Sequence, residues 1–209
     1  MELKNITGVF LGDSITEGWG AERYEDTYFN RLAKQTGMRA LGYGVGGTRI
    51  ARGGDERDGR RDFLYRCERM ERNADLVVVL GGSNDFGFRS PIEGEGEFAF
   101  SGACRLLFEK IKRLYPNAKL VVMLPLHRID CIVSRENTEG EAQLPLSRYV
   151  ETLQKIAEEY SLPIVNLYDE VDILKTEEGR MIYCPDGLHP NAAGHALIAE
   201  RLLQVLRKL

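Results

Sequence analysis

Long apolar runs and a leader pattern are both missing from this chain of 209 residues. No stretch approaches the roughly 20 apolar residues that a membrane-spanning helix needs. Residues 1–5 lead directly into an apolar run, without the basic segment and longer apolar segment of a secretory signal. We therefore expect a cytoplasmic protein that does not associate with a membrane.

Cysteine and histidine are scarce and scattered. The cysteines are Cys67, Cys104, Cys131 and Cys184. They stand far apart with no CxxC pair, which favours free thiols over a disulfide framework or a zinc site. The histidines are His127, His189 and His195. A two-metal site usually shows more histidines and bridging carboxylates than this chain offers. We expect neither a metal ion nor another cofactor.

Charge of one sign does not dominate either. The chain has 28 Lys and Arg against 32 Asp and Glu, with a net charge of −4. This balance gives no general reason to bind nucleic acid or an anionic surface. The arginines between residues 66 and 72 alternate with acids, which is typical of a solvated helix face. The length fits a single α/β domain over residues 1–209, and its oligomeric state stays open.

What the chain does contain is an alternation of strand and helix patterns. Short apolar runs that stop at turn residues predict buried parallel strands. These strands are expected at 7–11, 39–43, 75–80, 120–124 and 163–167. Apolar residues at helical spacing predict helices at 26–35, 63–70, 146–160 and 191–207. A further long helix is predicted to follow a loop at 86–97 and to end at about residue 115. Right-handed crossovers between such strands predict a three-layer α/β/α sandwich.

Polar residues follow several of these strands and precede the last helix. They supply Ser14, Asn84, Asp186 and His189, together with a glycine loop at 44–47. In a parallel sheet the carboxyl ends of the strands converge on one crevice, where ligands bind. The segments 86–97 and 127–143 are long enough to be lids or substrate loops rather than plain connections.

The residue types at these positions suit acyl transfer. A serine is a poor nucleophile unless a base removes its proton, and His189 can be that base. Asp186 lies three residues before His189 on a glycine-containing turn, so it can orient the ring and stabilise the imidazolium. A backbone N–H of the glycine loop, the Asn84 amide and the N–H of Ser14 could stabilise the oxyanion.

With these motifs the chain resembles the SGNH hydrolases, also called the GDSL esterases and lipases. The matching blocks, in family order, are Gly12-Asp13-Ser14, Gly44-Val45-Gly46-Gly47, Gly82-Ser83-Asn84-Asp85 and Asp186-Gly187-Leu188-His189-Pro190. The resemblance implies a flavodoxin-like parallel sheet in the order 2-1-3-4-5. It implies Ser14 as nucleophile, His189 as base and Asp186 as acid. Its oxyanion donors are the Ser14 N–H, the Gly47 N–H and the Asn84 side chain, although which glycine of 44–47 donates stays open.

The same residues also allow other functions, which the sequence favours less. The segment 42–47 also fits G-x-G-x-x-G, but that motif should follow a strong strand and open a helix, and here it does neither. A metallophosphoesterase could use four metal ligands, namely Asp13, Asp85, Asp186 and His189, yet too few histidines accompany them. An ordinary α/β-hydrolase elbow needs glycine where Thr16 stands. A carbohydrate-binding module on the same scaffold remains the non-enzyme alternative.

Substrate contacts are less specified by the sequence. Asp13, Trp19, Phe86 and His127 are candidates for substrate binding because each lies near a predicted strand end. Trp19 could equally be a core residue, and His127 a solvated one; for His195 we expect a structural role. Similarity to compact family members favours a small-molecule ester with a short acyl group, such as an acetylated carbohydrate. A lysophospholipase or thioesterase type of acyl hydrolase is the alternative.

Overall fold

The computed structural model describes residues 2–53, 61–128, 144–171 and 175–209. Most of the loop predicted at 127–143, from residue 129 on, lies outside these ranges, and so does Cys131. The other three cysteines are buried free thiols: Cys67, Cys104 and Cys184.

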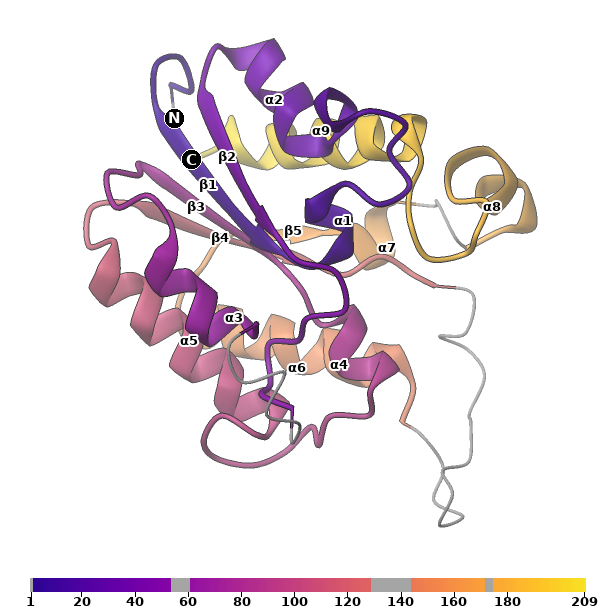
Figure 1. The fold of residues 1–209 in the computed structure, drawn as a ribbon. Coiled ribbons are helices and arrows are strands. Elements are labelled where there is room, and N and C mark those ends of the chain that lie inside the picture. Colours follow the sequence, from indigo (N-terminus) through magenta and orange to yellow (C-terminus); the bar gives the residue numbers. More distant parts are fainter. Residues whose placement is uncertain (1, 54–60, 129–143, 172–174) are drawn as a thin grey trace.

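A five-stranded, all-parallel sheet forms the centre of the fold (Figure 1). Its strands are β1 (Thr7–Gly12), β2 (Arg39–Gly44), β3 (Leu76–Leu80), β4 (Lys119–Leu124) and β5 (Ile164–Asn166). They pair in the order β2-β1-β3-β4-β5, which confirms the predicted order. Gly12 at the end of β1 is in register with Gly44 of β2 and Leu80 of β3. The residues that follow these three strands therefore start at one level of the sheet.

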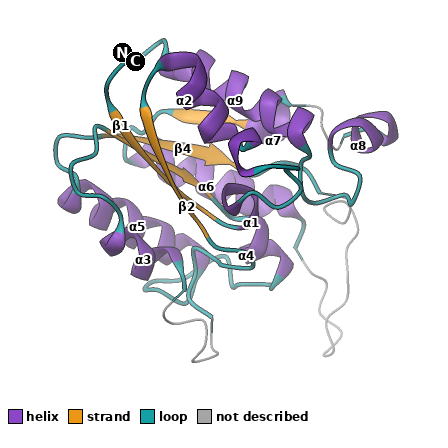
Figure 2. Cartoon of the chain, turned by 45° about the horizontal axis from the view of Figure 1, so that its top comes forward, coloured by secondary structure: helices purple, strands orange, loops and turns teal. Residues whose placement is uncertain are grey.

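Helices cover both faces of the sheet, as the strand and helix alternation predicts. The longer ones are α2 (Tyr28–Thr36), α5 (Phe100–Leu114), α6 (Leu146–Glu159) and α9 (Ala192–Leu206). Figures 1 and 2 show α2 and α9 on one face, and α5 and α6 on the other. Side chains alternate between these faces along each strand. In β3, for example, Val77 and Val79 belong to one core cluster, whereas Val78 belongs to the other.

Several short helices lie in segments for which the sequence predicts no helix. They are α1 (Ser14–Glu17), α4 (Ser83–Gly87), α7 (Leu167–Glu170) and α8 (Glu177–Tyr183). The helix predicted over 63–70 is split into α3 (Phe63–Arg66) and the 3-10 helix η2 (Cys67–Arg69), and a further 3-10 helix is η1 (Tyr24–Asp26). One or two helical turns are too short to show an amphipathic period, so periodicity could not reveal them.

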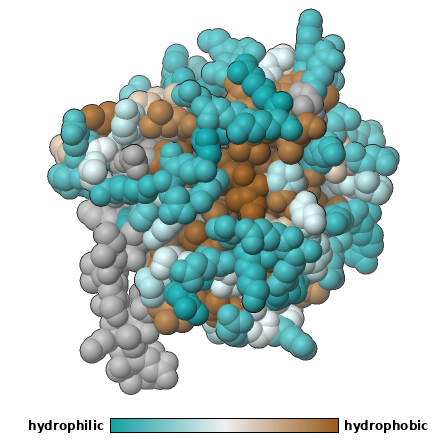
Figure 3. Space-filling model, turned by 180° about the vertical axis from the view of Figure 1, so that it is seen from behind, coloured by the Kyte–Doolittle hydropathy of each residue, from teal (hydrophilic) through white to brown (hydrophobic). Residues whose placement is uncertain are grey.

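The face of the molecule opposite to that seen in Figure 1 carries apolar residues at its centre with polar residues around them (Figure 3). A cavity of about 290 Å³ opens at the amino-terminal side of the sheet, where Val77, Leu120 and Leu162 are among its lining residues. Within the described ranges, no helix is both long and apolar enough to cross a membrane.

Candidate active site

Ser14 occupies the first position of α1, directly after the turn that ends β1. Asp13 caps this helix, because its side chain accepts a hydrogen bond from the N–H of Ile15 at 3.1 Å. The N–H of Ser14 lies in the first turn, where the helix itself provides no acceptor. The local sequence thus presents both the hydroxyl and the N–H of Ser14 at the carboxyl end of the sheet.

His189 and Asp186 complete a chain of hydrogen bonds to this serine. Ser14 Oγ lies 3.1 Å from His189 Nε2, and His189 Nδ1 lies 2.7 Å from Asp186 Oδ2. Burial raises the pKa of Asp186, but the N–H groups of His189 and Leu188 and the His189 ring outweigh it and lower the pKa overall. The carboxylate is therefore ionised where the ring needs it. The structure brings together all three residues that the sequence predicted to be catalytic.

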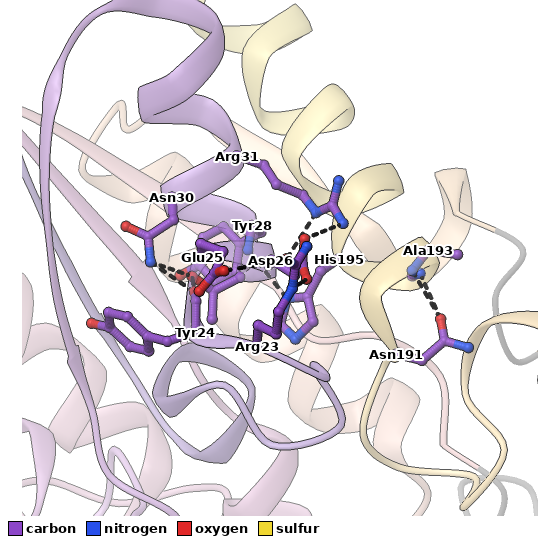
Figure 4. A network of polar contacts seen from close by, with 12 residues as sticks. Arg23, Tyr24, Glu25, Asp26, Tyr28, Asn30, Arg31, Asn191, Ala193 and His195 are labelled. Atoms are coloured by element: carbon purple, nitrogen blue, oxygen red, sulfur yellow. Dashed lines mark hydrogen bonds and ion pairs between the residues drawn. The ribbon is translucent and has the colours of Figure 1, made fainter.

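The loop that carries His189 is held by the helix that follows it. Asn191 caps α9, since its Oδ1 accepts hydrogen bonds from the N–H groups of Ala193 and Gly194, each at 3.0 Å. Its side chain also donates to the carbonyl of Ile182 in α8 at 2.8 Å. Figure 4 shows this cap beside the polar network of η1 and α2. Two residues after His189, the chain is thus anchored to two helices.

His195 lies on α9 and belongs to that network rather than to the triad (Figure 4). It is fully buried, its ring stacks on Tyr28, and its Nδ1 accepts a hydrogen bond from the Tyr28 N–H at 3.3 Å. Burial lowers the pKa of His195 to about 4. His195 is thus a neutral imidazole of α9 that packs against α2. These surroundings fit the structural role that the sequence predicts for it.

Besides the N–H of Ser14, the predicted oxyanion donors are Gly47 and Asn84, and a hydrogen bond joins the two segments that carry them. Gly47 has a positive φ of 72° and is exposed. Asn84 belongs to α4, and its Nδ2 donates to the carbonyl of Thr48, the next residue after Gly47, at 3.0 Å. A carboxamide has two donors, so this bond leaves Asn84 one more. By contrast, the N–H of Gly46 donates to Glu17 Oε2 at 2.6 Å. Among the glycines 46 and 47, the latter is thus the better candidate.

Asp85 holds the far end of the glycine loop. Its carboxylate is fully buried and accepts the N–H groups of Ile50 and Ala51 at 3.0 and 2.8 Å. Burial raises the pKa of Asp85 to about 6, although these two hydrogen bonds and the charge of Arg49 oppose the rise. Asp85 therefore acts on the shape of the loop and is placed away from solvent.

Arg66 is a residue that sequence reasoning missed. Its charged neighbours suggested a solvated face, but the side chain is buried, so that prediction is wrong here. Its guanidinium donates to the carbonyl of Gly12 at 2.9 Å and to Thr48 Oγ1 at 2.8 Å. It also donates to the carbonyl of Tyr43. Arg66 thereby ties the ends of β1 and β2 to Thr48, which follows the glycine loop. No local signal distinguishes it from the exposed Arg69.

Two candidate substrate contacts are corrected by their burial. Phe86 is only 2% exposed and packs edge-on against Tyr149, so it belongs to the core and offers no surface to a ligand. Asp13 is 3% exposed because its carboxylate faces inward to cap α1. His127 is partly buried and stacks on Tyr168 with ring centroids 3.8 Å apart. Trp19 differs from these three candidates in that it is exposed and its ring packs on His189.

Trp19 is 54% exposed, and its ring centroid lies 5.3 Å from that of His189. Two cavities are not lined by the triad residues. One is the cavity of about 290 Å³ at the amino-terminal side of the sheet, and the other, of about 470 Å³, lies beside α3 and α5, where Leu64, Glu97 and Lys110 contribute to its lining. In the part of the chain that the structure describes, no three His, Cys, Asp or Glu side chains are grouped to hold a metal ion.

This parallel sheet with a Ser-His-Asp chain at its carboxyl edge defines an SGNH-type hydrolase. Residues 10–197 match the model of the GDSL-like lipase/acylhydrolase family, and the chain belongs to that family. The resemblance found in the sequence is therefore confirmed. Among curated proteins, none matches this chain.

Solved structures of similar chains share the fold. A protein from Lactobacillus plantarum is 25% identical, with a TM-score of 0.83 over 100% of this chain and 98% of its own. An acetyl-xylooligosaccharide esterase from Geobacillus is 21% identical, with a TM-score of 0.69 over 98% of this chain and 96% of its own. A two-domain esterase active on acetylated mannans is 22% identical, with a TM-score of 0.64 over 99% of this chain and 50% of its own.

Proposed function

We propose that this protein is a serine ester hydrolase that works through an acyl-enzyme and acts on a short-acyl ester, with acetylated carbohydrates as the substrate class. The observation that carries the proposal is the unbroken hydrogen-bond chain from Asp186 through His189 to Ser14. A binding module has no use for a nucleophile aligned with its base. The likeness to two esterases of acetylated sugars supports the choice of substrate.

The reaction would proceed in two displacements. His189 Nε2 takes the proton of Ser14 as Oγ bonds to the ester carbon and the carbonyl electrons move to oxygen. The N–H groups of Ser14 and Gly47 and the second N–H of Asn84 stabilise this oxyanion. As it collapses, the bond to the alcohol oxygen breaks, and His189 returns the proton to that oxygen. Water then attacks the acyl-serine in the same way and releases the acid.

A substrate panel tests the acyl group. Esters of p-nitrophenol from acetyl to palmitoyl are compared with acetylated xylo-oligosaccharides and mannans, using the wild type and Ser14→Ala. We expect the highest kcat/KM for acetyl esters, release of acetate from the sugars, and no turnover by the variant. A preference for long acyl chains would favour the lysophospholipase or thioesterase alternative. Sugar binding without turnover of any ester would favour the binding module.

Covalent labelling tests the nucleophile separately. A serine-directed phosphonate should add to the wild type at Ser14, because His189 activates that hydroxyl alone. Mass spectrometry of a protease digest locates the adduct, and Ser14→Ala is the control. An adduct at another residue, with Ser14→Ala still active, would disprove the proposed nucleophile.

A further inference from the structure

Trp19 is a large apolar side chain that is left half exposed beside the base. Its indole is tilted by 47° against the His189 ring, and it is the only tryptophan of the chain. Other large apolar side chains, such as Phe88 and Phe98, are also exposed, but Trp19 packs on the ring of His189. Its position beside a reactive group, rather than its exposure, makes it a candidate for contact with a ligand.

The backbone on both sides of Trp19 is fixed by the catalytic segments. Gly18 is left-handed, with φ of 105°, and the N–H groups of Gly18 and Trp19 both donate to the carbonyl of Ser14, at 3.0 and 2.9 Å. Gly20 lies against the backbone of residues 189–190, which we call the base loop. A Cβ on Gly20 would be 2.7 Å from the carbonyl oxygen of His189 and 2.4 Å from that of Pro190. Trp19 is therefore held in place between nucleophile and base.

The far edge of the indole reaches the glycine loop. A Cβ on Gly46 would lie 3.1 Å from Trp19 Cζ2 and 3.0 Å from Glu17 Oε2, so the absence of a side chain there lets the ring approach. Glu17 in turn holds the Gly46 N–H. The indole thus extends from the loop of the predicted oxyanion donors to His189, and it forms one wall of the site.

The chemistry of the base decides which half of an ester meets this wall. His189 Nε2 must come within about 2.6–3.2 Å of the leaving alcohol oxygen to return its proton. The carbon skeleton attached to that oxygen is therefore brought next to the ring that packs on His189. The acyl group, on the opposite side of the ester carbon, extends away from this proton transfer.

We propose that Trp19 is the platform on which the ring of the alcohol half, a pyranose, stacks by its C–H face. The electron-rich face of an indole suits such C–H groups, and its flat surface selects a ring over a chain. Trp19 would thus set the preference for the alcohol rather than for the acyl group. The substrate preference rests on the function proposed above, whereas sugar stacking on Trp19 does not require turnover.

Kinetics with paired substrates test the preference. Trp19→Ala, Trp19→Phe and the wild type are assayed on a methyl xyloside acetate and on ethyl acetate. For Trp19→Ala we expect kcat/KM to fall about tenfold or more on the sugar, the scale of one aromatic contact, and to change little on ethyl acetate. Trp19→Phe should keep most of the sugar activity. Phe98→Ala, which removes another exposed aromatic ring with 57% exposure, is the matched control.

Two kinetic outcomes would overturn the proposal. An equal fall on both substrates would mean that Trp19 only positions His189. Ethyl hexanoate is assayed as a third substrate. If Trp19→Ala lowers kcat/KM on ethyl hexanoate but not on ethyl acetate, the indole contacts the acyl chain instead.

Fluorescence tests the stacking without any turnover. Because the chain has a single tryptophan, its emission reports on Trp19 alone. Titration of Ser14→Ala with acetylated xylo-oligosaccharide should shift or quench this emission, with a midpoint equal to the Kd from calorimetry. Calorimetric binding without an emission change, or no binding at all, would overturn the proposal. An emission change with a wild type that hydrolyses no ester would refute the proposed function and leave the platform standing.

Discussion

Asn84 uses the two donors of its carboxamide for different ends. One holds the carbonyl of Thr48 and so fixes the loop of Gly47, and the other is proposed to meet the oxyanion. A donor that is already oriented stabilises the charged intermediate more than the neutral ester, so it lowers the barrier without tightening binding.

Asn84→Ala should therefore lose about 10²–10³ in kcat with little change in KM, provided that chemistry is rate-limiting. Asn84→Asp should be at least as poor, since a carboxylate would face both the oxyanion and the Thr48 carbonyl. Steady-state kinetics and thermal unfolding are measured on the same preparation. Asn30→Ala is the control for stability, because it loses a similar hydrogen bond from a side-chain amide to the carbonyl of Tyr24. An Asn84→Ala protein that is merely less stable, with unchanged kcat per folded molecule, would contradict the assignment.

Asp13 has a buried carboxylate in the turn directly before Ser14. Burial raises its pKa from 3.8 to about 6, although the N–H of Ile15 and the charges of Arg66 and His189 oppose the rise. Since the folded-state pKa is the higher one, the native state binds an extra proton between these values. The contribution of this group to the free energy of unfolding is full below about pH 4 and is lost as the pH rises through about 6.

Asp13→Asn should remove this dependence, because an asparagine oxygen can still accept the Ile15 N–H but does not titrate. The stability of the wild type relative to the variant should fall by about 2 kcal/mol between pH ~4 and ~7. Urea unfolding across that range measures it. Asp85, whose pKa burial also raises to about 6, is present in both proteins and cancels. Parallel pH profiles of the two proteins would show that Asp13 is ionised in the fold throughout.

At the scale of elements, the catalytic geometry depends on how closely the segment after α1 approaches the segment before α9. Gly20 makes that contact, with φ of 83° and no room for a Cβ next to the backbone of Pro190. Gly96 has a similar φ of 78°, but nothing lies within 4 Å of a Cβ there. The two glycines share the same backbone strain on substitution and differ only in the contact.

Gly20→Ala should lower kcat by about 10²-fold, because a displacement of His189 by ~1 Å is enough for such a loss. Gly96→Ala should lose only stability, by roughly 1–2 kcal/mol for a left-handed alanine. Kinetics corrected for the folded fraction, together with unfolding curves, separate the two effects. Equal kcat values in the two variants would mean that the contact with the base loop does not control the geometry.

At the scale of the whole molecule, the chemistry is predicted to need no metal. The proposed nucleophile Ser14 lies near the start of the chain, whereas the proposed base His189 and orienting acid Asp186 lie together on one turn before α9. Ester hydrolysis should be unchanged after exhaustive treatment with EDTA, measured with p-nitrophenyl acetate. Loss of activity that Mn²⁺ or Zn²⁺ restores would favour the phosphoesterase alternative.

The layered architecture and the positions of the triad could be predicted from the sequence because both depend on local patterns. Apolar runs that stop at Gly12 and Gly81 mark buried strands, and polar residues beyond such stops must lie at one edge of a parallel sheet. The strand order followed from the family resemblance, since periodicity specifies strands but not their neighbours. Four motifs in order were enough to nominate Ser14, Asp186 and His189.

Only the tertiary structure decided which side chains are covered. Asp13, Arg66 and Phe86 are buried because residues far along the chain enclose them, while the similar Arg69 and Phe88 stay exposed. The contact of Trp19 with His189 likewise joins segments that are distant in sequence. Burial and such contacts depend on how several elements pack together, and the local alternation of residue types carries no record of that packing.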